Sequence, residues 1–116
     1  MIKNFLNSKK EEIKNCHDGE GTLKHITVFE DDELKSNLRF INYTILPPGT
    51  SIGTHQHGND EEVYVILEGN GEMTLSSKIH KVKSGDVVLN KPYGIHSLTN
   101  TSRTEMRILV FEVAID

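Results

Sequence analysis

Short runs of apolar and β-branched residues alternate with polar turns along most of the chain. Two early runs, residues 22–29 and 38–46, are rich in β-branched and aromatic side chains and predict strands. Beyond the Pro47-Pro48-Gly49 turn, the runs become shorter and follow one another closely. Further strands are predicted at residues 51–57, 62–68, 72–76, 80–82, 87–89, 96–99 and 106–114. Many short strands separated by turns predict an antiparallel sandwich or barrel.

The first 20 or so residues follow a different pattern, in which apolar residues are mixed with lysines and glutamates. The spacing of Phe5, Leu6 and Ile13 allows a short helical turn, but nearby asparagines weaken that pattern. We expect an N-terminal arm, about residues 1–20, that packs on the body of the domain or on a second subunit. The whole chain is expected to be one domain, with its barrel over about residues 38–114.

Composition narrows the class of protein. The chain has 116 residues and a formal net charge of -4, a length typical of one domain with a core that needs no disulfides. Its lysines and arginines are scattered and no nucleic-acid-binding motif occurs, so we expect no nucleic-acid partner. The single cysteine, Cys16, fits a reducing compartment. With no apolar run near the ~18 residues of a membrane span and no signal-peptide core, we expect a soluble cytoplasmic protein without a membrane partner.

The candidate chemistry lies in the middle of the chain. His55 and His57 are two residues apart in a predicted strand, so their imidazoles project from the same face. A short polar turn, Gly58-Asn59-Asp60, follows and can bring Glu62 on the next strand towards that face. Imidazole nitrogens together with a carboxylate oxygen suit a divalent transition metal. His96, farther along the chain, is the candidate fourth ligand.

The other histidines give weaker signals. His17 follows Cys16, but adjacent residues need not face each other and no third group orients them, which argues against a catalytic pair. We expect His25 to be half-exposed on a strand and His80 to face solvent.

Strand alternation also predicts the lining of a pocket. Ser51 and Gly53 are expected on the face of His55, and Tyr64 on the face of Glu62. Other side chains expected at a partly apolar cavity are Phe40, Tyr43 and Met73.

Two sequence motifs resemble those of the cupin family, whose members are small double-stranded β-helix barrels. The first family motif contains a glycine, an HxH pair, a glutamate and a second glycine at fixed intervals. Gly49, His55, His57, Glu62 and Gly69 fit every interval.

The second cupin motif matches at its two ends and departs in the middle. Gly85, His96 and Asn100 are in register with the family pattern. Pro92 is displaced by one position, and a single residue separates Gly94 from the histidine. Because the overall span is unchanged, we expect a different loop and an unaltered position for His96.

The resemblance implies an all-β double-stranded β-helix, or jelly roll, and a metal held by His55, His57, Glu62 and His96. The family spacing also admits Glu61, which would face the opposite side of the strand, but the usual family position favours Glu62. About two positions of an octahedral ion would remain open for water, oxygen or a bidentate substrate. The ligand types suit Fe, Mn, Ni, Co, Cu or Zn.

The resemblance implies two candidate functions. The preferred one is a metal-dependent enzyme acting on a small molecule, since small cupins include dioxygenases, isomerases, lyases and decarboxylases, among which the fold does not decide. The alternative is a binding or sensing module that captures a sugar or another small ligand without turnover. Because small cupins tend to pair through edge strands, we expect a homodimer.

Overall fold

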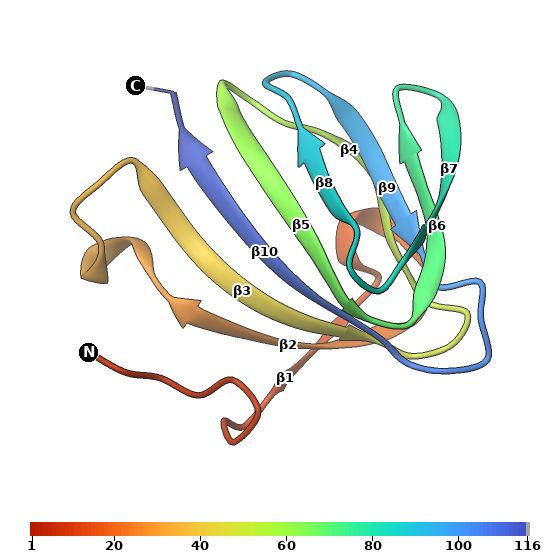
Figure 1. Ribbon diagram of the computed structural model, residues 1–116, viewed down its shortest axis with the longest axis horizontal. Helices are drawn as coiled ribbons and strands as arrows, with labels where there is room; N and C mark the ends of the chain where they lie inside the picture. The colour runs from red at the N-terminus through yellow and green to blue at the C-terminus, as the bar shows by residue number, and fades with distance from the viewer. Residues whose placement is uncertain (116) are drawn as a thin grey trace.

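Two antiparallel β-sheets face each other in the computed structural model, which describes residues 1–115 (Figure 1). The six-stranded sheet has the order β1-β2-β3-β10-β5-β8, and the four-stranded sheet has the order β4-β9-β6-β7. Two 3₁₀ turns, η1 (Cys16–Asp18) and η2 (Asp31–Glu33), lie near the N-terminus. The strands are β1 (Glu11–Lys14), β2 (Thr22–Phe29), β3 (Leu38–Leu46), β4 (Ser51–Gln56), β5 (Asp60–Glu68), β6 (Asn70–Leu75), β7 (Lys78–Lys83), β8 (Val87–Asn90), β9 (Ile95–Thr99) and β10 (Met106–Ala114). The predicted all-β double-stranded β-helix is confirmed.

The predicted strands are all present, and the N-terminal arm adds one that was not predicted. Strand β1 pairs with β2, from Glu11 opposite His25 to Lys14 opposite Thr22. Its sequence, EEIK, has one apolar residue, so no alternation of apolar and polar positions marks it as a strand. The arm therefore packs on the body of its own domain, which was one of the two expected arrangements.

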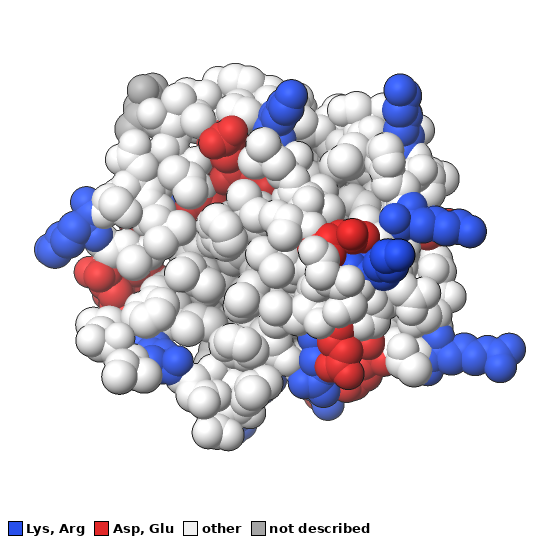
Figure 2. Space-filling model, in the orientation of Figure 1, with Lys and Arg blue, Asp and Glu red and all other residues white. Residues whose placement is uncertain are grey.

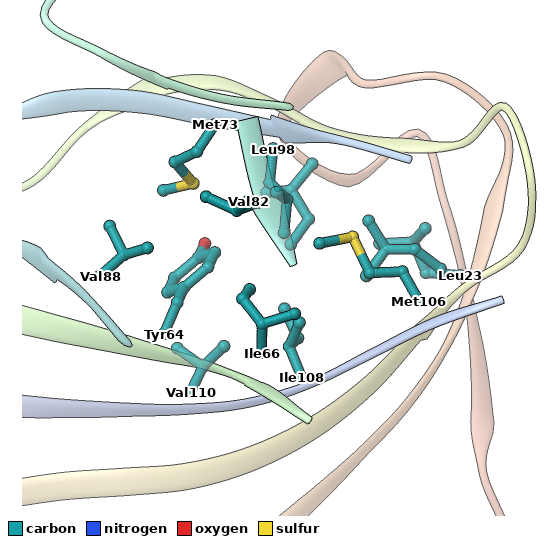
Figure 3. Close-up of a cluster of buried hydrophobic side chains, with 12 residues drawn as sticks. Leu23, Tyr64, Ile66, Met73, Val82, Val88, Leu98, Met106, Ile108 and Val110 are labelled. Atoms are coloured by element: carbon teal, nitrogen blue, oxygen red, sulfur yellow. The ribbon is translucent and has the colours of Figure 1, made fainter. Parts of the chain in front are cut away.

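A hydrophobic core fills the space between the two sheets (Figure 3). Tyr64 and Ile66 point into it from β5, while Met73 and Leu98 point into it from the opposite sheet. Alternate residues of a strand face the same side, so each strand contributes every second side chain. Fully burying one such side chain stabilises the fold by about 1.5–3 kcal/mol.

A smaller apolar cluster covers the other face of the six-stranded sheet. Val28, Tyr43 and Ile45 form it, and Phe5 of the arm packs against Tyr43 with 4.3 Å between ring centroids. Tyr43 and Met73 were predicted to line the cavity beside the candidate metal ligands. That prediction was wrong, because Tyr43 belongs to this cluster and Met73 belongs to the main core.

Asn100, the last residue of the second motif, holds two chain segments together. Its side-chain amide donates to the carbonyl oxygens of Leu46 and Thr104, each at 2.8 Å, and its Oδ1 accepts from the backbone N–H of Ser102 at 2.9 Å. The side chain is fully buried, so these bonds satisfy polar groups that water does not reach. Asn100 thus ties the loop between β9 and β10 to the end of β3.

Charged side chains are dispersed on the face of the molecule in Figure 2. Blue groups project mostly at its outline, red groups and a mixed cluster lie farther in, and much of the middle and left of this face is uncharged. The described chain contains no helix with the length and apolar character that a membrane crossing requires.

Candidate metal centre

The two sheets bring a histidine pair and a carboxylate together in the interior. His55 on β4 lies directly opposite His96 on β9 in the strand pairing, with 4.2 Å between ring centroids. Glu62 points towards them from β5 of the other sheet. One ligand atom from each of these residues lies within 4.8 Å of the other two.

His57 joins this group from just beyond the end of β4. Its backbone N–H donates to the carbonyl oxygen of Gly94 at 3.1 Å, which ties it to the loop before β9. Its Nε2 atom lies 3.6 Å from Oε1 of Glu62, and Nε2 of His96 lies 3.3 Å from the same oxygen. The His57 and His96 rings stack, 4.5 Å apart and 3° from parallel. The three imidazoles therefore lie near the Glu62 carboxylate in two groups that share it, His55 with His96 in one and His57 with Glu112 in the other.

The structure places Glu62 and its neighbour Glu61 on opposite faces of β5. Buried and half-buried positions alternate along β5, and Glu62 is buried whereas Glu61 is half-buried on the opposite face. In the described part of the chain, Glu61 belongs to no group of candidate ligands, whereas Glu62 is grouped with His55 and His96 and also with His57 and Glu112.

The chemical state of these side chains fits a metal cation. Nδ1 of His55 lies 2.8 Å from the carbonyl oxygen of Gly53, which can only accept, so this nitrogen carries the proton and Nε2 keeps the lone pair. Burial lowers the pKa of His55, which favours the neutral ring. Among residues 1–115, Nε2 of His57, Nε2 of His96 and Oε1 of Glu62 are buried without a hydrogen-bond partner. An unsatisfied buried polar group costs about 1–3 kcal/mol, and a divalent ion bound to all three atoms would remove that cost.

A β-bulge in β4 turns His55 towards the interior. Ile52 pairs with Leu98 and His55 pairs with His96, so three steps along β4 match two along β9. The extra residue shifts the alternation, and Ile52 and His55 therefore face the same cavity. The prediction that Ser51 and Gly53 share the face of His55 was wrong for this reason.

The bulge lies against turn η1. A Cβ atom on Gly53 would lie 2.0 Å from the carbonyl oxygen of His17, and one on Gly19 would lie 2.3 Å from the carbonyl oxygen of Ser51. Only glycine allows two backbones to approach this closely. Glycine at these two positions therefore allows η1 to pack directly against β4.

Turn η1 has an unusual backbone and covers one side of the site. His17 and Asp18, and Asn15 just before the turn, have φ of 50°, 62° and 49°, in the left-handed region that His, Asp and Asn adopt more readily than most other residues. The His17 ring stacks on His55, 3.8 Å between centroids and 10° from parallel. The position of His17 beside His55 was not predicted, because its approach to β4 depends on a contact between residues far apart in the chain.

A cavity of about 130 Å³ adjoins the His55–Glu62 side of the site. Since one water takes about 30 Å³ of liquid, the cavity has room for a few waters or a small organic acid. Nδ1 of His25 and Oγ1 of Thr44 lie 2.9 Å apart on its polar wall. The lining residues are Ile13, Cys16, His17, Leu23, His25, Phe40, Asn42, Thr44, Ile52, His55, Glu62, Tyr64 and Val110.

Two proton-bearing groups line this cavity next to Glu62. Burial, and then the charge of Glu62, raises the pKa of the Cys16 thiol. The same two causes raise the pKa of the Tyr64 hydroxyl well above its usual value. Both groups therefore keep their protons at neutral pH and can donate hydrogen bonds. His80, by contrast, is exposed and lies outside this cavity lining, as expected.

Comparisons with known proteins give the same fold. The family model for the cupin domain matches residues 42–112. An oxalate-binding protein from Thermotoga maritima is 31% identical over 99 residues, which cover 85% of this chain and 82% of that protein. The crystal structure of a predicted oxalate decarboxylase from Thermotoga maritima is similar, with a TM-score of 0.96 and 28% identity over 99% of this chain and 100% of that one. An uncharacterized protein from Methanocaldococcus jannaschii is 38% identical over 65 residues, covering 56% of this chain and 52% of that protein.

Proposed function

Because this chain belongs to the cupin domain family, we propose that it binds one divalent transition-metal ion through His55, His57, Glu62 and His96. The observation that supports this proposal is the convergence of ring nitrogens on a single buried oxygen of Glu62. Three imidazoles and one carboxylate are donors that suit Fe, Mn, Ni, Co, Cu or Zn.

We further propose that the chain binds a small dicarboxylate such as oxalate in the adjoining cavity. The cavity volume, about 130 Å³, supports a ligand of this size. The similar protein named for oxalate binding supports the chemical class. A bound metal would supply a Lewis acid that holds carboxylate oxygens at its open positions.

The charge of the cavity makes this binding depend on the metal. Within the described part of the chain, neither lysine nor arginine lines the cavity, while Glu62 places a negative charge there. Burying a dianion beside that carboxylate without a compensating cation would be strongly unfavourable. Oxalate is therefore expected to bind the metal-loaded protein and not the metal-free protein.

Protein side chains would orient the ligand and limit its size. Phe40 and Ile52 form an apolar wall that excludes water, and Asn42 and Thr44 offer hydrogen bonds from the polar wall. Turn η1 covers the cavity from the side of His17. A longer dicarboxylate is expected to fit poorly.

Turnover is a second candidate function, favoured by the proton-bearing groups of Cys16 and Tyr64 at the cavity wall. Loss of carbon dioxide from oxalate leaves formate, which requires delivery of a proton to carbon. Cys16 and Tyr64 carry protons at the cavity wall and are the candidate donors, although their raised pKa values make them weak acids at neutral pH.

Isothermal titration calorimetry with oxalate tests both candidates. The protein loaded with Mn(II) is expected to bind oxalate, with weaker binding of succinate, and the metal-free protein to bind neither. Formate accumulating in the same mixture would identify turnover as the function. Equal binding of oxalate by the loaded and metal-free proteins would contradict the proposed site.

The homodimer and the cytoplasmic location expected from the sequence stay predictions.

A further inference from the structure

A second group of polar side chains adjoins the candidate metal ligands but lies outside the cavity lining. Glu112 on β10 is directly opposite Glu62 on β5, and Asp60 is two residues before Glu62 on the same face of the strand. Ligand atoms of His57, Glu62 and Glu112 lie within 4.8 Å of one another. Asp60, like His57, is more than nine-tenths buried, with 7% of its surface exposed.

The His57 ring lies between two carboxylates of this group. Its Nδ1 atom is 3.2 Å from Oδ1 of Asp60, and its Nε2 atom is 3.6 Å from Oε1 of Glu62. A neutral imidazole carries a proton on one nitrogen and a lone pair on the other. Oδ1 of Asp60 is buried without a hydrogen-bond partner among the described residues, and Nδ1 of His57 lies beside it. A proton on Nδ1 could supply that partner and would leave the lone pair on Nε2, on the side of Glu62 and the metal position.

Arg39 anchors the outer side of the group. Its guanidinium lies 4.0 Å from Oδ2 of Asp60 and 3.6 Å from Oε2 of Glu112.

We propose that Asp60 is a positioning residue, which accepts the Nδ1 proton of His57 and so directs the Nε2 lone pair towards the metal. This role rests on the proposed metal site. Carboxylates that orient metal-binding histidines in this way commonly contribute 10- to 100-fold to metal affinity. The sequence contained no sign of this role, because Asp60 was interpreted there as part of a polar turn.

Nuclear magnetic resonance of the metal-free protein tests the tautomer independently of metal binding. The imidazole ¹⁵N shifts of His57 are expected to report a proton on Nδ1 in the unsubstituted chain. In Asp60→Ala, a substantial fraction should carry the proton on Nε2. A ring protonated on Nε2 in the unsubstituted chain would overturn the proposal, even if the protein binds metal.

Co(II) affinity, measured by competition with a chromophoric chelator, tests the consequence. Asp60→Ala is expected to weaken binding by about 10- to 100-fold, and Asp60→Asn by less, because asparagine retains an acceptor oxygen. Glu61→Gln, which changes a carboxyl group on the other face of β5, is the matched control and should leave the affinity unchanged. Circular dichroism and thermal melting of each variant check that the fold is retained.

A double-mutant cycle separates positioning from a general effect of charge. In a His57→Ala background, Asp60→Ala is expected to cause no further loss of Co(II) affinity. The same loss in both backgrounds would overturn the proposal, as would an Asp60→Ala affinity equal to that of Glu61→Gln. If the unsubstituted chain bound no Co(II) while the Nδ1 tautomer was observed, the proposed metal function would fail and the contact between Asp60 and His57 would stand.

Discussion

Glu62→Gln is expected to weaken divalent metal binding by at least about 100-fold, or about 2.8 kcal/mol. The substitution keeps the size of the side chain and removes the negative charge that His57 and His96 face at 3.6 and 3.3 Å. Loss of the only anionic member of the proposed ligand set should therefore lower the affinity without opening a cavity. Competition with a chromophoric chelator would measure the dissociation constant.

Glu61→Gln provides the matched control for Glu62→Gln. It makes the same chemical change one residue away, on the half-buried face of β5. The control is expected to bind metal as tightly as the unsubstituted chain. Equal affinities for the two variants would show that the Glu62 carboxylate does not bind the ion.

Gly53→Ala is expected to destabilise the fold by about 3 kcal/mol, because overpacking of a tight contact forces the backbone to move. The new Cβ would lie 2.0 Å from the carbonyl oxygen of His17, so η1 and β4 could not keep their present distance. Movement of the bulge would also misdirect His55, and metal affinity should fall with stability. Urea unfolding of the metal-free protein would measure the loss.

Gly58→Ala is the control for Gly53→Ala within the same segment. A Cβ on Gly58 would meet no atom within 4 Å, and its φ is outside the left-handed region. Its free energy of unfolding should change by no more than about 0.5 kcal/mol. Equal stability of the two variants would show that the close contact between η1 and β4 at Gly53 does not matter for the stability of the fold.

The sequence predicted the strands of the barrel because each carries its own pattern of apolar residues and turns. It also predicted that His55, Glu62 and His96 would meet, since their positions follow from motif spacing. Strand β1 was missed, because a four-residue strand with one apolar side chain is recognisable only through its pairing with β2.

The parts of the site that were not predicted depend on contacts between distant segments. The bulge in β4 breaks the alternation from which the pocket lining was inferred. Gly53 is the one residue of the local sequence that could have indicated a bulge. His17 reaches the site through the approach of Gly19 to β4, which no residue spacing encodes. Asp60 belongs to a turn in sequence but begins β5 in the structure, where it is buried beside His57.

Elemental analysis of the purified, untagged protein tests the central claim most directly. The unsubstituted chain is expected to carry about one equivalent of Fe, Mn, Ni, Co, Cu or Zn. The His55→Ala/His57→Ala variant, with its fold verified by circular dichroism, should carry none. If neither protein contained metal after reconstitution with each of these ions, the account of a metal-binding cupin would be contradicted.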